Sequence, residues 1–269
     1  LLKADDARRA VAEAAPDAIL HLAGQPRVGA SFHDPAATLR LNAHAALHVL
    51  EAARAAAPKA RVIVVSSCEI YGAAPPERLP LREDAPPAPV SPYAVSKAAA
   101  EFMGRAYHHT HRLPVVILRL FNHTGPGQAA NFVCAELARK VALAEAGRGP
   151  AVLTVGRTSI VRDFLDVRDV AVAYALAIEK AAPGVTYNVA SGRGVTIRDV
   201  IDRLTALARR PIAVREDPAL YRTADIPVIV GDASRFRDAT GWAPARGLDE
   251  TLGDLLEDWR RRVTQRGEA

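Results

Sequence analysis

The sequence predicts an α/β protein built on a parallel, doubly wound sheet. Short runs rich in β-branched residues recur along the chain and are typical of buried strands, most clearly at residues 61–65. Longer segments with apolar residues at helical spacing separate these runs. Strands that alternate with helices pair in parallel, because each crossover helix returns the chain to the same end of the sheet.

The elements can be placed in chain order. Alanines and Val11 share one face over residues 5–15, and Pro16 ends that helix. Thr196 and Asp199 form a capping-box pattern that predicts the start of another helix. The expected helices are 5–15, 35–57, 92–109, 131–146, 168–181, 197–209 and 248–262, and the expected strands are 18–22, 61–65, 115–121, 151–155, 185–189 and 212–214.

Composition limits the possible classes of protein. A chain of 269 residues, 49% of them hydrophobic, can fill one large α/β unit or two modest domains. The formal charge of +5 is spread over scattered basic residues, so we expect no nucleic-acid partner, although an anionic substrate would suit this balance. No apolar run approaches the roughly 18 residues of a membrane span. We expect a cytoplasmic protein that does not bind a membrane.

Small or polar residues follow three of the expected strands. Ala23 and Gly24 come after strand 18–22, and Ser66 and Ser67 come after the strand at 61–65. The strand at 115–121 is followed by Asn122 and a turn rich in hydrogen-bonding groups. Open α/β sheets bind ligands at the carboxyl ends of their strands. The sequence therefore predicts a binding site at this edge of the sheet, and the proline-rich residues 71–92 are expected to fold over it.

Tyr93 and Lys97 lie four residues apart on the expected helix 92–109, whose first turn begins with Pro92. That spacing places both side chains on one helical face. A lysine held beside a tyrosine favours the phenolate, which lowers the pKa of the phenol from its ordinary value of about 10. The pair suits acid/base chemistry on an alcohol or a ketone. Taken alone, the spacing can also arise by chance.

Other chemistries have weaker support. The histidines at 108, 109 and 111 lack a carboxylate partner and are typical of a solvated helix end, so we expect no metal site. No Gly-x-Ser-x-Gly pattern of a serine hydrolase is present. Cys68 and Cys134 lie in apolar surroundings and are expected to be buried, reduced thiols.

Taken together, the motifs resemble those of the extended short-chain dehydrogenase/reductase family of nucleotide-sugar epimerases, dehydratases and reductases. The likeness covers nearly the whole chain. It rests on residues 21–24, residues 66–72, the Tyr93/Lys97 helix, residues 122–128, residues 162–164, and Arg222 with Asp225. Six matches in the family's order make the resemblance specific.

The resemblance implies a Rossmann-like sheet with a smaller carboxyl-terminal α/β substrate domain. Residues 1–128 would form the dinucleotide-binding core. Residues 129–269 would be mainly the substrate-binding region, with about 160–180 returning to the core. The family normally opens with a Gly-x-x-Gly-x-x-Gly turn, whereas the first glycine here is Gly24. We therefore expect a core that lacks its amino-terminal segment and binds dinucleotide poorly as written.

The resemblance also implies residue roles for a reaction that uses NADP or NAD. Tyr93 would give a proton to the new alkoxide, Ser67 would hydrogen-bond the same oxygen, and Lys97 would tune the phenol and contact the nicotinamide ribose. The residues expected to contact the cofactor are Leu22, Ala23, Gly24, Ser66, Tyr93, Lys97, Leu120 and Phe121.

A nucleotide-sugar substrate is the expected partner. By resemblance it would be held by Asn122, Asn131, Arg162, Arg222 and Asp225. An arginine suits this task because its planar fork binds phosphate oxygens in pairs. For Arg162 an ordinary ion pair with Asp163 or Asp166 is the alternative. The family also implies a homodimer, formed by helices 35–57 and 92–109 as a four-helix bundle.

Three functions stay open. Residues 122–128 and the tail from Gly231 to Trp242 look most like the family's GDP-4-dehydro-6-deoxy-D-mannose reductases, which reduce a C4 keto group. Glu69 could instead be the base that a GDP-mannose 4,6-dehydratase needs, or it could simply order its loop. The third possibility is a nucleotide-sugar-binding or regulatory member of the fold without catalysis.

Overall fold

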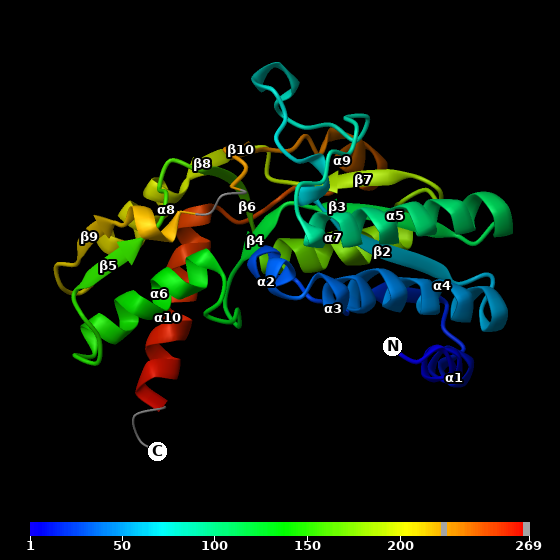
Figure 1. Cartoon of the computed structure of the whole chain (residues 1–269), viewed down its shortest axis with the longest axis horizontal. Coiled ribbons are helices and arrows are strands. Elements are labelled where there is room, and N and C mark those ends of the chain that lie inside the picture. The colour runs from blue at the N-terminus through cyan, green and yellow to red at the C-terminus, as the bar shows by residue number, and fades with distance from the viewer. Residues whose placement is uncertain (222–224, 266–269) are drawn as a thin grey trace. The chain divides into compact units, whose positions relative to one another are not determined.

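A computed structural model describes residues 1–221 and 225–265, which form two compact units (Figure 1). The chain passes between the units several times, so neither is one continuous stretch. The first unit consists of Leu1–Phe121, Val172–Val189 and Gly231–Trp242, and the second consists of Asn122–Ala171, Ala190–Val230 and Ala243–Ala269.

The first unit contains a four-stranded sheet in the order β1-β2-β3-β7, with every neighbouring pair parallel. Its strands are β1 (Ala18–His21), β2 (Arg61–Ser67), β3 (Val115–Leu120) and β7 (Thr186–Val189). All six residues of β3 are buried, as expected for a central strand covered on both faces. The predicted α/β fold with a parallel sheet is confirmed.

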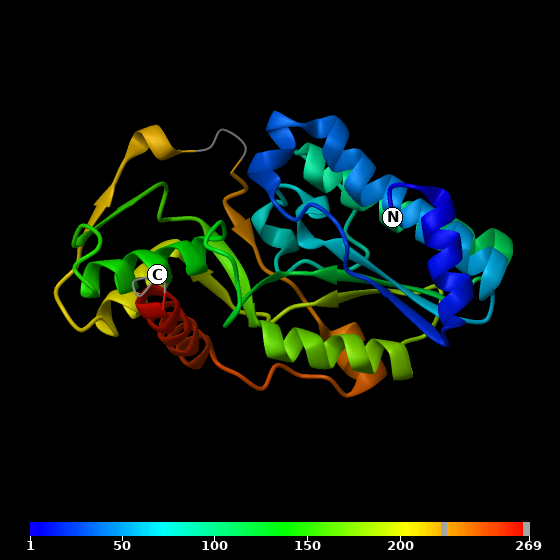
Figure 2. The ribbon, with the colours of Figure 1, turned by 90° about the horizontal axis from the view of Figure 1, so that it is seen from below.

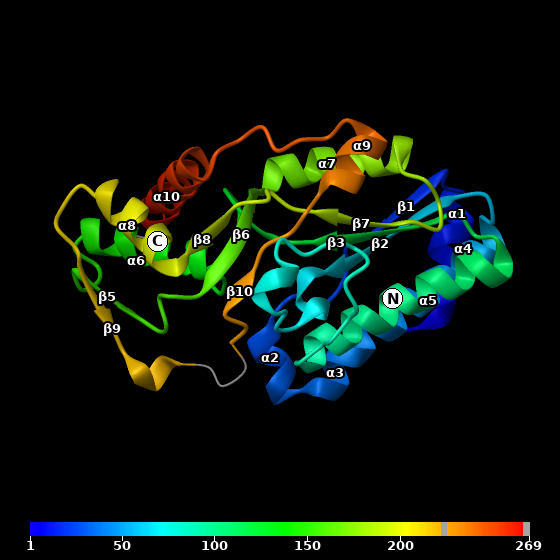
Figure 3. The same cartoon turned by 90° about the horizontal axis from the view of Figure 1, so that it is seen from above.

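Helices cover both faces of this sheet. In Figure 3, α4 (Ala45–Ala56) and α5 (Pro92–His111) lie on one side of the strands, and α7 (Val167–Lys180) and α9 (Ser234–Thr240) lie on the other. The approach of α5 is close. A Cβ at Gly104 would come within 3.0–3.3 Å of the side chains of Ile117, Val115 and Val64. This helix is therefore held tightly against β2 and β3.

The start of α5 is fixed by its sequence. The Ser91 hydroxyl accepts a hydrogen bond from the Ala94 amide at 3.1 Å, and Pro92 occupies the first turn. The helix ends at Arg112, which adopts a left-handed conformation with φ of 58°. Tyr93 and Lys97 consequently lie in its first two turns, as the sequence predicts.

The expected helix 35–57 is interrupted. It consists of α3 (Pro35–Leu39), a π-helical turn (Arg40–His44) and α4, and a short helix α2 (Val28–His33) precedes it. The buried Asn42 lies inside the π turn, where its side chain bonds backbone outside the helix. Apolar periodicity does not reveal such a turn, because the extra residue shifts the pattern by less than one helical turn. The first helix, α1 (Ala4–Ala14), lies where it was expected.

The second unit is organised around three helices that share one apolar core, which includes Leu137, Leu204, Leu256 and Trp259. They are α6 (Val133–Glu145), α8 (Ile197–Ala206) and α10 (Leu248–Gln265), and Figure 2 shows α10 beside α6. The capping box that starts α8 is confirmed, since the Asp199 amide donates to the Thr196 hydroxyl at 2.9 Å and the Thr196 amide donates to Asp199 at 2.9 Å.

Two small sheets complete the second unit. In the first, β6 (Val161–Asp166) pairs in parallel with β4 (Asn122–Thr124) and β10 (Val228–Ile229) and antiparallel with β8 (Gly194–Thr196). The second pairs β5 (Val152–Val155) with β9 (Ala213–Glu216). The turn expected at residue 122 is instead a three-residue strand. The elements β8 and β10 are too short to carry a periodic pattern.

Three 3₁₀ turns, Cys68–Tyr71, Pro76–Arg78 and Pro218–Leu220, lie in the connections. Every helix within residues 1–221 and 225–265 is too short or too polar to cross a lipid bilayer.

Candidate active site

Ser67 and Tyr93 meet in the first unit, where β2 ends and α5 begins. Their side chains lie close enough together for Ser67 to act on the pKa of Tyr93. Burial raises the pKa of Tyr93 above its ordinary value, and the neighbouring Ser67 hydroxyl opposes that rise because it favours the phenolate. Tyr93 is 8% exposed, so its hydroxyl lies in a largely dry environment. The phenol therefore keeps its proton at neutral pH.

Lys97 is fixed beside this pair. Its Nζ donates a hydrogen bond to the Val65 carbonyl oxygen at 2.8 Å, at the end of β2. Burial lowers the pKa of Lys97 from 10.5 to about 8. The expected lowering of the pKa of Tyr93 by Lys97 is wrong for this structure, because burial of the phenol dominates and the ammonium is directed at Val65.

His21 at the end of β1 responds to the same surroundings. Burial, together with the positive charges of Lys97 and of the amino terminus, lowers the pKa of His21 to about 4. The imidazole is therefore neutral near pH 7. Three neighbouring groups, Tyr93, Lys97 and His21, thus have pKa values shifted toward their uncharged forms, which is typical of functional sites.

Glu69 lies in the 3₁₀ turn that follows Ser67. Its amide donates to the Ser67 hydroxyl at 3.2 Å, so Ser67 caps this turn. The negative charge of Glu69 also contributes to the raised pKa of Tyr93, which places the carboxylate in electrostatic reach of the phenol. Both roles considered for Glu69, ordering the loop and acting as a base, are compatible with this position.

The loop after β1 is anchored by a residue that sequence reasoning missed. The Asn42 side chain accepts from the Gln25 amide at 2.7 Å and donates to the Gln25 carbonyl at 3.0 Å and to the Ser96 hydroxyl at 2.9 Å. A Cβ at Gly24 would meet Asn42 Oδ1 at 2.6 Å, so this contact requires glycine. An asparagine among the apolar residues of helix 35–57 was the available signal.

The residues expected to contact a nicotinamide cofactor differ in exposure. Leu22, Ala23 and Gly24 are exposed after β1, whereas Leu120 and Phe121 at the end of β3 are buried. Leu22 and Ala23 also line an apolar cavity of about 290 Å³ bounded by α1 and β1.

Polar groups at the strand ends fit the ribose of such a cofactor. Ser66 is 2% exposed, and its hydroxyl has no hydrogen-bond partner among the described residues. A buried hydroxyl of this kind is expected to bind a ligand or water. The ammonium of Lys97 bonds to the carbonyl oxygen of Val65, the residue before Ser66. The Ser66 hydroxyl and the Lys97 ammonium are therefore suited to bind the hydroxyls of a nicotinamide ribose.

In the second unit, Asn122 and Arg162 lie on adjacent strands. Asn122 pairs with Phe164, two residues after Arg162 on β6, so both side chains leave the same face of this ladder. The Asn122 Oδ1 is buried without a hydrogen-bond partner in residues 1–221 and 225–265. Arg162 Nη1 donates to the carbonyl oxygens of Val161 and Ile226, each at 2.8 Å.

The remaining predicted substrate residues also belong to the second unit. Asp225 is half-buried and directly precedes Ile226, which Arg162 contacts. Asn131 is exposed in the turn before α6. Arg222 lies outside the described residues.

The carboxylates considered as partners for Arg162 have contacts of their own. Asp163 accepts from the Ser191 amide at 2.8 Å, the Ser191 hydroxyl at 2.6 Å and the Gly192 amide at 2.9 Å. Asp166 pairs with Arg168 at 2.7 Å. No cluster of three or more metal-binding side chains occurs in the part of the chain that the structure describes, where both cysteines are buried thiols outside any disulfide.

Comparison with known proteins places these features in a family. A family model described as GDP-mannose 4,6 dehydratase matches residues 1–255. The GDP-6-deoxy-D-mannose reductase of Pseudomonas aeruginosa is 39% identical over 93% of this chain and 82% of its own length.

Solved structures agree with this match. RMD from Pseudomonas aeruginosa complexed with NADPH is 38% identical, with a TM-score of 0.91 over 97% of this chain and 87% of that chain. The UDP-glucose 4-epimerase of Thermus thermophilus in complex with NAD is 32% identical, with a TM-score of 0.86 over 96% and 82%. The predicted Rossmann-like fold and the resemblance to NAD(P)-dependent nucleotide-sugar enzymes are confirmed. The chain belongs to the GDP-mannose 4,6 dehydratase family, within the extended short-chain dehydrogenases/reductases.

Proposed function

We propose that this protein is an NAD(P)H-dependent reductase of the C4 keto group of GDP-4-dehydro-6-deoxy-D-mannose. The observation that carries the proposal is the placement of Ser67 close to the buried Tyr93, with Lys97 one turn farther along α5. Its specificity for the GDP-linked sugar rests on the reductase that is 39% identical over most of the chain. The NADPH complex of the similar RMD structure supports the same cofactor class.

In this reaction a bound nicotinamide coenzyme supplies the hydride. Tyr93 holds a proton at neutral pH, because burial raises the pKa of its phenol, and passes that proton to the developing C4 alkoxide. Ser67 stabilises the same oxygen with a hydrogen bond. Its hydroxyl already accepts from the Glu69 amide at 3.2 Å, so its own hydrogen is free for donation to Tyr93 or to the substrate.

Lys97 and the strand ends would hold the coenzyme. The ammonium of Lys97 is presented at the end of β2, where it can donate to ribose hydroxyls. Ser66 adds a buried hydroxyl, and the exposed Leu22, Ala23 and Gly24 offer apolar and backbone contacts after β1. The buried Leu120 and Phe121, at the carboxyl end of β3, would complete this region.

The second unit would bind the nucleotide diphosphate-sugar. Arg162 is half-buried and presented by β6, and an arginine fork can bind two phosphate oxygens at once. Asn122 offers an amide whose oxygen has no hydrogen-bond partner in the described residues. Asp225 and Asn131 belong to the same unit, and Arg222 is included from sequence alone.

A second candidate, GDP-mannose 4,6-dehydratase, is favoured by Glu69. A dehydratase must remove the C5 proton and expel the C6 hydroxyl, which needs a carboxylate close to the Ser/Tyr pair. Glu69 lies two residues after Ser67 and acts electrostatically on Tyr93. The family model that matches the chain carries the dehydratase description.

One two-armed assay separates the candidates. The full-length protein is given GDP-4-dehydro-6-deoxy-D-mannose with NADPH and, separately, GDP-mannose with NADP. Oxidation of NADPH in the first arm alone supports the reductase. Formation of the keto-sugar in the second arm supports the dehydratase. If neither arm reacts, the proposed GDP-sugar specificity fails.

The homodimer expected from the sequence is also a proposal. Several large apolar side chains on the helices concerned are exposed: Val95 is 44% and Phe102 is 49% exposed on α5, and Leu39 and Leu41 are each 37% exposed. A four-helix bundle between two copies would cover these residues. Sedimentation of the wild type and of Phe102→Glu tests it, since the substitution should produce a monomer. The cytoplasmic location stays a prediction of the sequence.

A further inference from the structure

A buried ion pair joins β3 to the helix that carries the candidate catalytic residues. Arg119 of β3 is 1% exposed and Glu101 of α5 is fully buried. Arg119 Nη2 donates to Glu101 Oε1 at 2.7 Å, and Nε donates to Oε2 at 3.1 Å. Two parallel hydrogen bonds fix both the distance and the plane of the guanidinium. The ion pair therefore sets where α5 lies along β3.

Glu101 shares a face of α5 with the candidate site. It lies four residues after Lys97 and eight after Tyr93, and this spacing repeats along one side of an α-helix. The carboxylate that Arg119 holds is thus on the same stripe as the phenol and the ammonium. A rotation or a shift of α5 that loosened the ion pair would also move Tyr93.

The other side of the guanidinium holds the turn that follows Ser67. Arg119 Nη1 donates to Tyr71 Oη at 2.8 Å and to the Glu83 carbonyl oxygen at 3.0 Å. The guanidinium carbon also lies 4.8 Å from the centre of the Tyr71 ring. Tyr71 is the last residue of the 3₁₀ turn Cys68–Tyr71, which Ser67 caps. One buried cation therefore contacts both α5, which carries Tyr93, and the turn that Ser67 caps.

Tyr71 is held from both sides of its hydroxyl. The Tyr71 Oη accepts from Arg119 and donates to Asn188 Oδ1 of β7 at 2.7 Å. The backbone amide of Asn188 donates to Glu83 Oε1 at 2.8 Å. Burial raises the pKa of Tyr71 to about 12, although Arg119 opposes the rise, so the phenol remains a donor over the working pH range. Hydrogen bonds to both β3 and β7 therefore hold the last residue of the turn after Ser67 in place.

A buried pair of this kind contributes little net stability, because removing two charges from water costs about as much as their attraction returns. An apolar pair could fill the same volume. The charged pair instead fixes the relative positions of its partners. Only an arginine presents donors to a carboxylate on one side and to a hydroxyl and a carbonyl on the other.

We infer that Arg119 is a positioning residue for the proposed reductase: it fixes α5 against the turn after Ser67 and so sets the distance between the Ser67 and Tyr93 hydroxyls. This inference rests on the proposed function. Arg119 would not touch the substrate, and it would act only by positioning Ser67 and Tyr93.

The test compares two tyrosine-to-phenylalanine substitutions in the full-length protein. Tyr71→Phe removes the hydroxyl that Arg119 and Asn188 hold, without changing the size of the ring. Tyr107→Phe is the matched control. Tyr107 lies farther along α5, and its hydroxyl donates to Glu51 of α4. Tyr71→Phe should lower kcat about tenfold or more while KM for NADPH stays within about twofold, and Tyr107→Phe should match the wild type.

A spectroscopic measurement decides the inference even if the proposed substrate is wrong. With ¹³Cζ-labelled tyrosine, the Tyr93 resonance is assigned by its loss in Tyr93→Phe, among only six tyrosines. Tyr71→Phe and Arg119→Lys should move this resonance toward its position in Ser67→Ala, while Tyr107→Phe should not. A Tyr93 resonance unchanged in Tyr71→Phe, or moved equally in Tyr107→Phe, overturns the inference. Absence of turnover in the wild type counts against the proposed function alone.

Discussion

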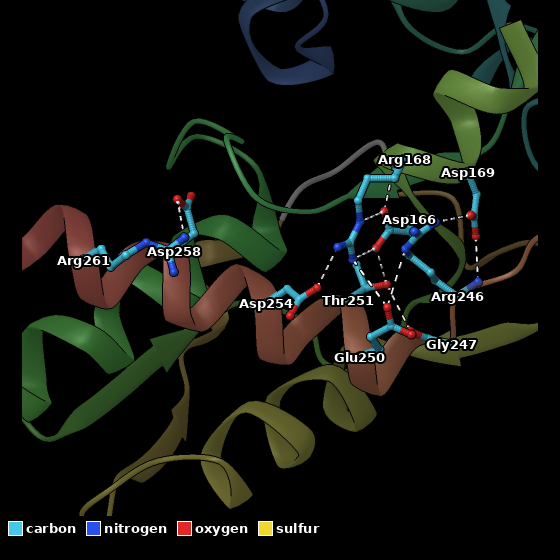
Figure 4. Close-up of polar contacts among 10 residues, drawn as sticks. All are labelled: Asp166, Arg168, Asp169, Arg246, Gly247, Glu250, Thr251, Asp254, Asp258 and Arg261. Carbon is cyan, nitrogen blue, oxygen red and sulfur yellow. Dashed lines mark hydrogen bonds and ion pairs between the residues drawn. The ribbon is translucent and has the colours of Figure 1, made fainter. Parts of the chain in front are cut away.

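Two clusters of polar side chains, one in each unit, differ in how their charges are balanced. The first is the candidate site of Ser67, Tyr93, Lys97 and His21. The second, here called the α10 cluster, surrounds the start of α10 (Figure 4). It consists of Asp166, Arg168, Asp169, Arg246, Glu250, Thr251 and Asp254.

In the α10 cluster every charge has an opposite charge within reach. Arg168 donates to both carboxylate oxygens of Asp166, at 2.8 and 2.7 Å, and pairs with Asp254 at 2.8 Å. The Thr251 hydroxyl adds a 2.8 Å hydrogen bond to Asp166. Burial alone would raise the pKa of Asp166, but the hydrogen bonds from Arg168 and Thr251 outweigh it and lower that pKa. Hydrogen bonds to Asp166 likewise raise the pKa of Arg168.

In the candidate site, burial decides the outcome instead. It raises the pKa of Tyr93 and lowers the pKa values of Lys97 and His21, so each charged form is less favourable than in water, while Lys97, with a pKa of about 8, is still mostly an ammonium near pH 7. Groups poised in this way can exchange protons, whereas the paired charges of the α10 cluster cannot do so without breaking an ion pair. We therefore expect the first cluster to carry the chemistry and the second to hold α10 in place. Substitutions should therefore affect turnover in one and stability in the other.

The largest expected effect is that of Tyr93→Phe on turnover. Loss of the proton donor should lower kcat about 10²- to 10⁴-fold, because general acid catalysis contributes that much. The melting temperature should change little, since the ring that fills the site is kept. Steady-state kinetics and thermal unfolding measure both. A variant with kcat close to that of the wild type would remove Tyr93 from the chemistry.

A smaller effect, of the opposite kind, is expected for Asp166→Asn. Weakening the bonds to Arg168 and Thr251 should cost about 2 kcal/mol of folding free energy, a factor of about 30 in the folding equilibrium. The kcat of the folded protein should stay within about twofold. The comparison would fail if the variant lost turnover without losing stability in urea unfolding.

The contribution of the Asp166 carboxylate to stability should also appear in the pH dependence of unfolding at acidic pH. The pKa of Asp166 is lower in the folded protein than its ordinary value of 3.8, so its contribution is complete above 3.8 and is lost as pH falls through the folded value. Asp166→Asn should therefore lose less stability than the wild type over that acidic range.

The smallest expected effect is a change in how stability depends on pH. Lys97 has a pKa of about 8 in the folded protein against an ordinary 10.5. Between these values the unfolded chain binds more protons than the folded protein, so the Lys97 contribution makes stability rise with pH. Lys97→Met should remove that part of the rise. The control Lys140→Met, which replaces a half-exposed lysine of α6, should keep the wild-type slope in urea unfolding at pH 8 and 10.5.

The sequence predicts long elements well because their patterns are local. The apolar run of β2, the Ser91–Pro92 start of α5 and the Thr196 capping box each act within a few residues. The short strands β8 and β10 pair with β6, and the short helix α2 packs against α5, so their neighbours are not local in sequence. The three residues of β4 likewise depend on β6, far along the chain, so a turn was the natural prediction for residue 122.

The candidate site shows a similar division. Ser67, Tyr93 and Lys97 could be predicted because their order and spacing match a family. Arg119 and Glu101 could not, since their pairing depends on how α5 packs on β3. Two signals were present: a lone arginine inside an apolar strand, and an acidic residue one helical repeat after Lys97. The pKa of Tyr93 also needed the structure, because its burial is not visible in the sequence.

Transfer of deuterium tests the central claim most directly. The full-length protein is incubated with GDP-4-dehydro-6-deoxy-D-mannose and NADPH that carries deuterium at the reactive C4 position, and the product is analysed by mass spectrometry and NMR. The proposed function predicts one deuterium at C4 of the sugar for each NADPH oxidised, with the rate falling at least about 100-fold in Tyr93→Phe. An unchanged keto-sugar, or a reduced sugar without deuterium at C4, would contradict it.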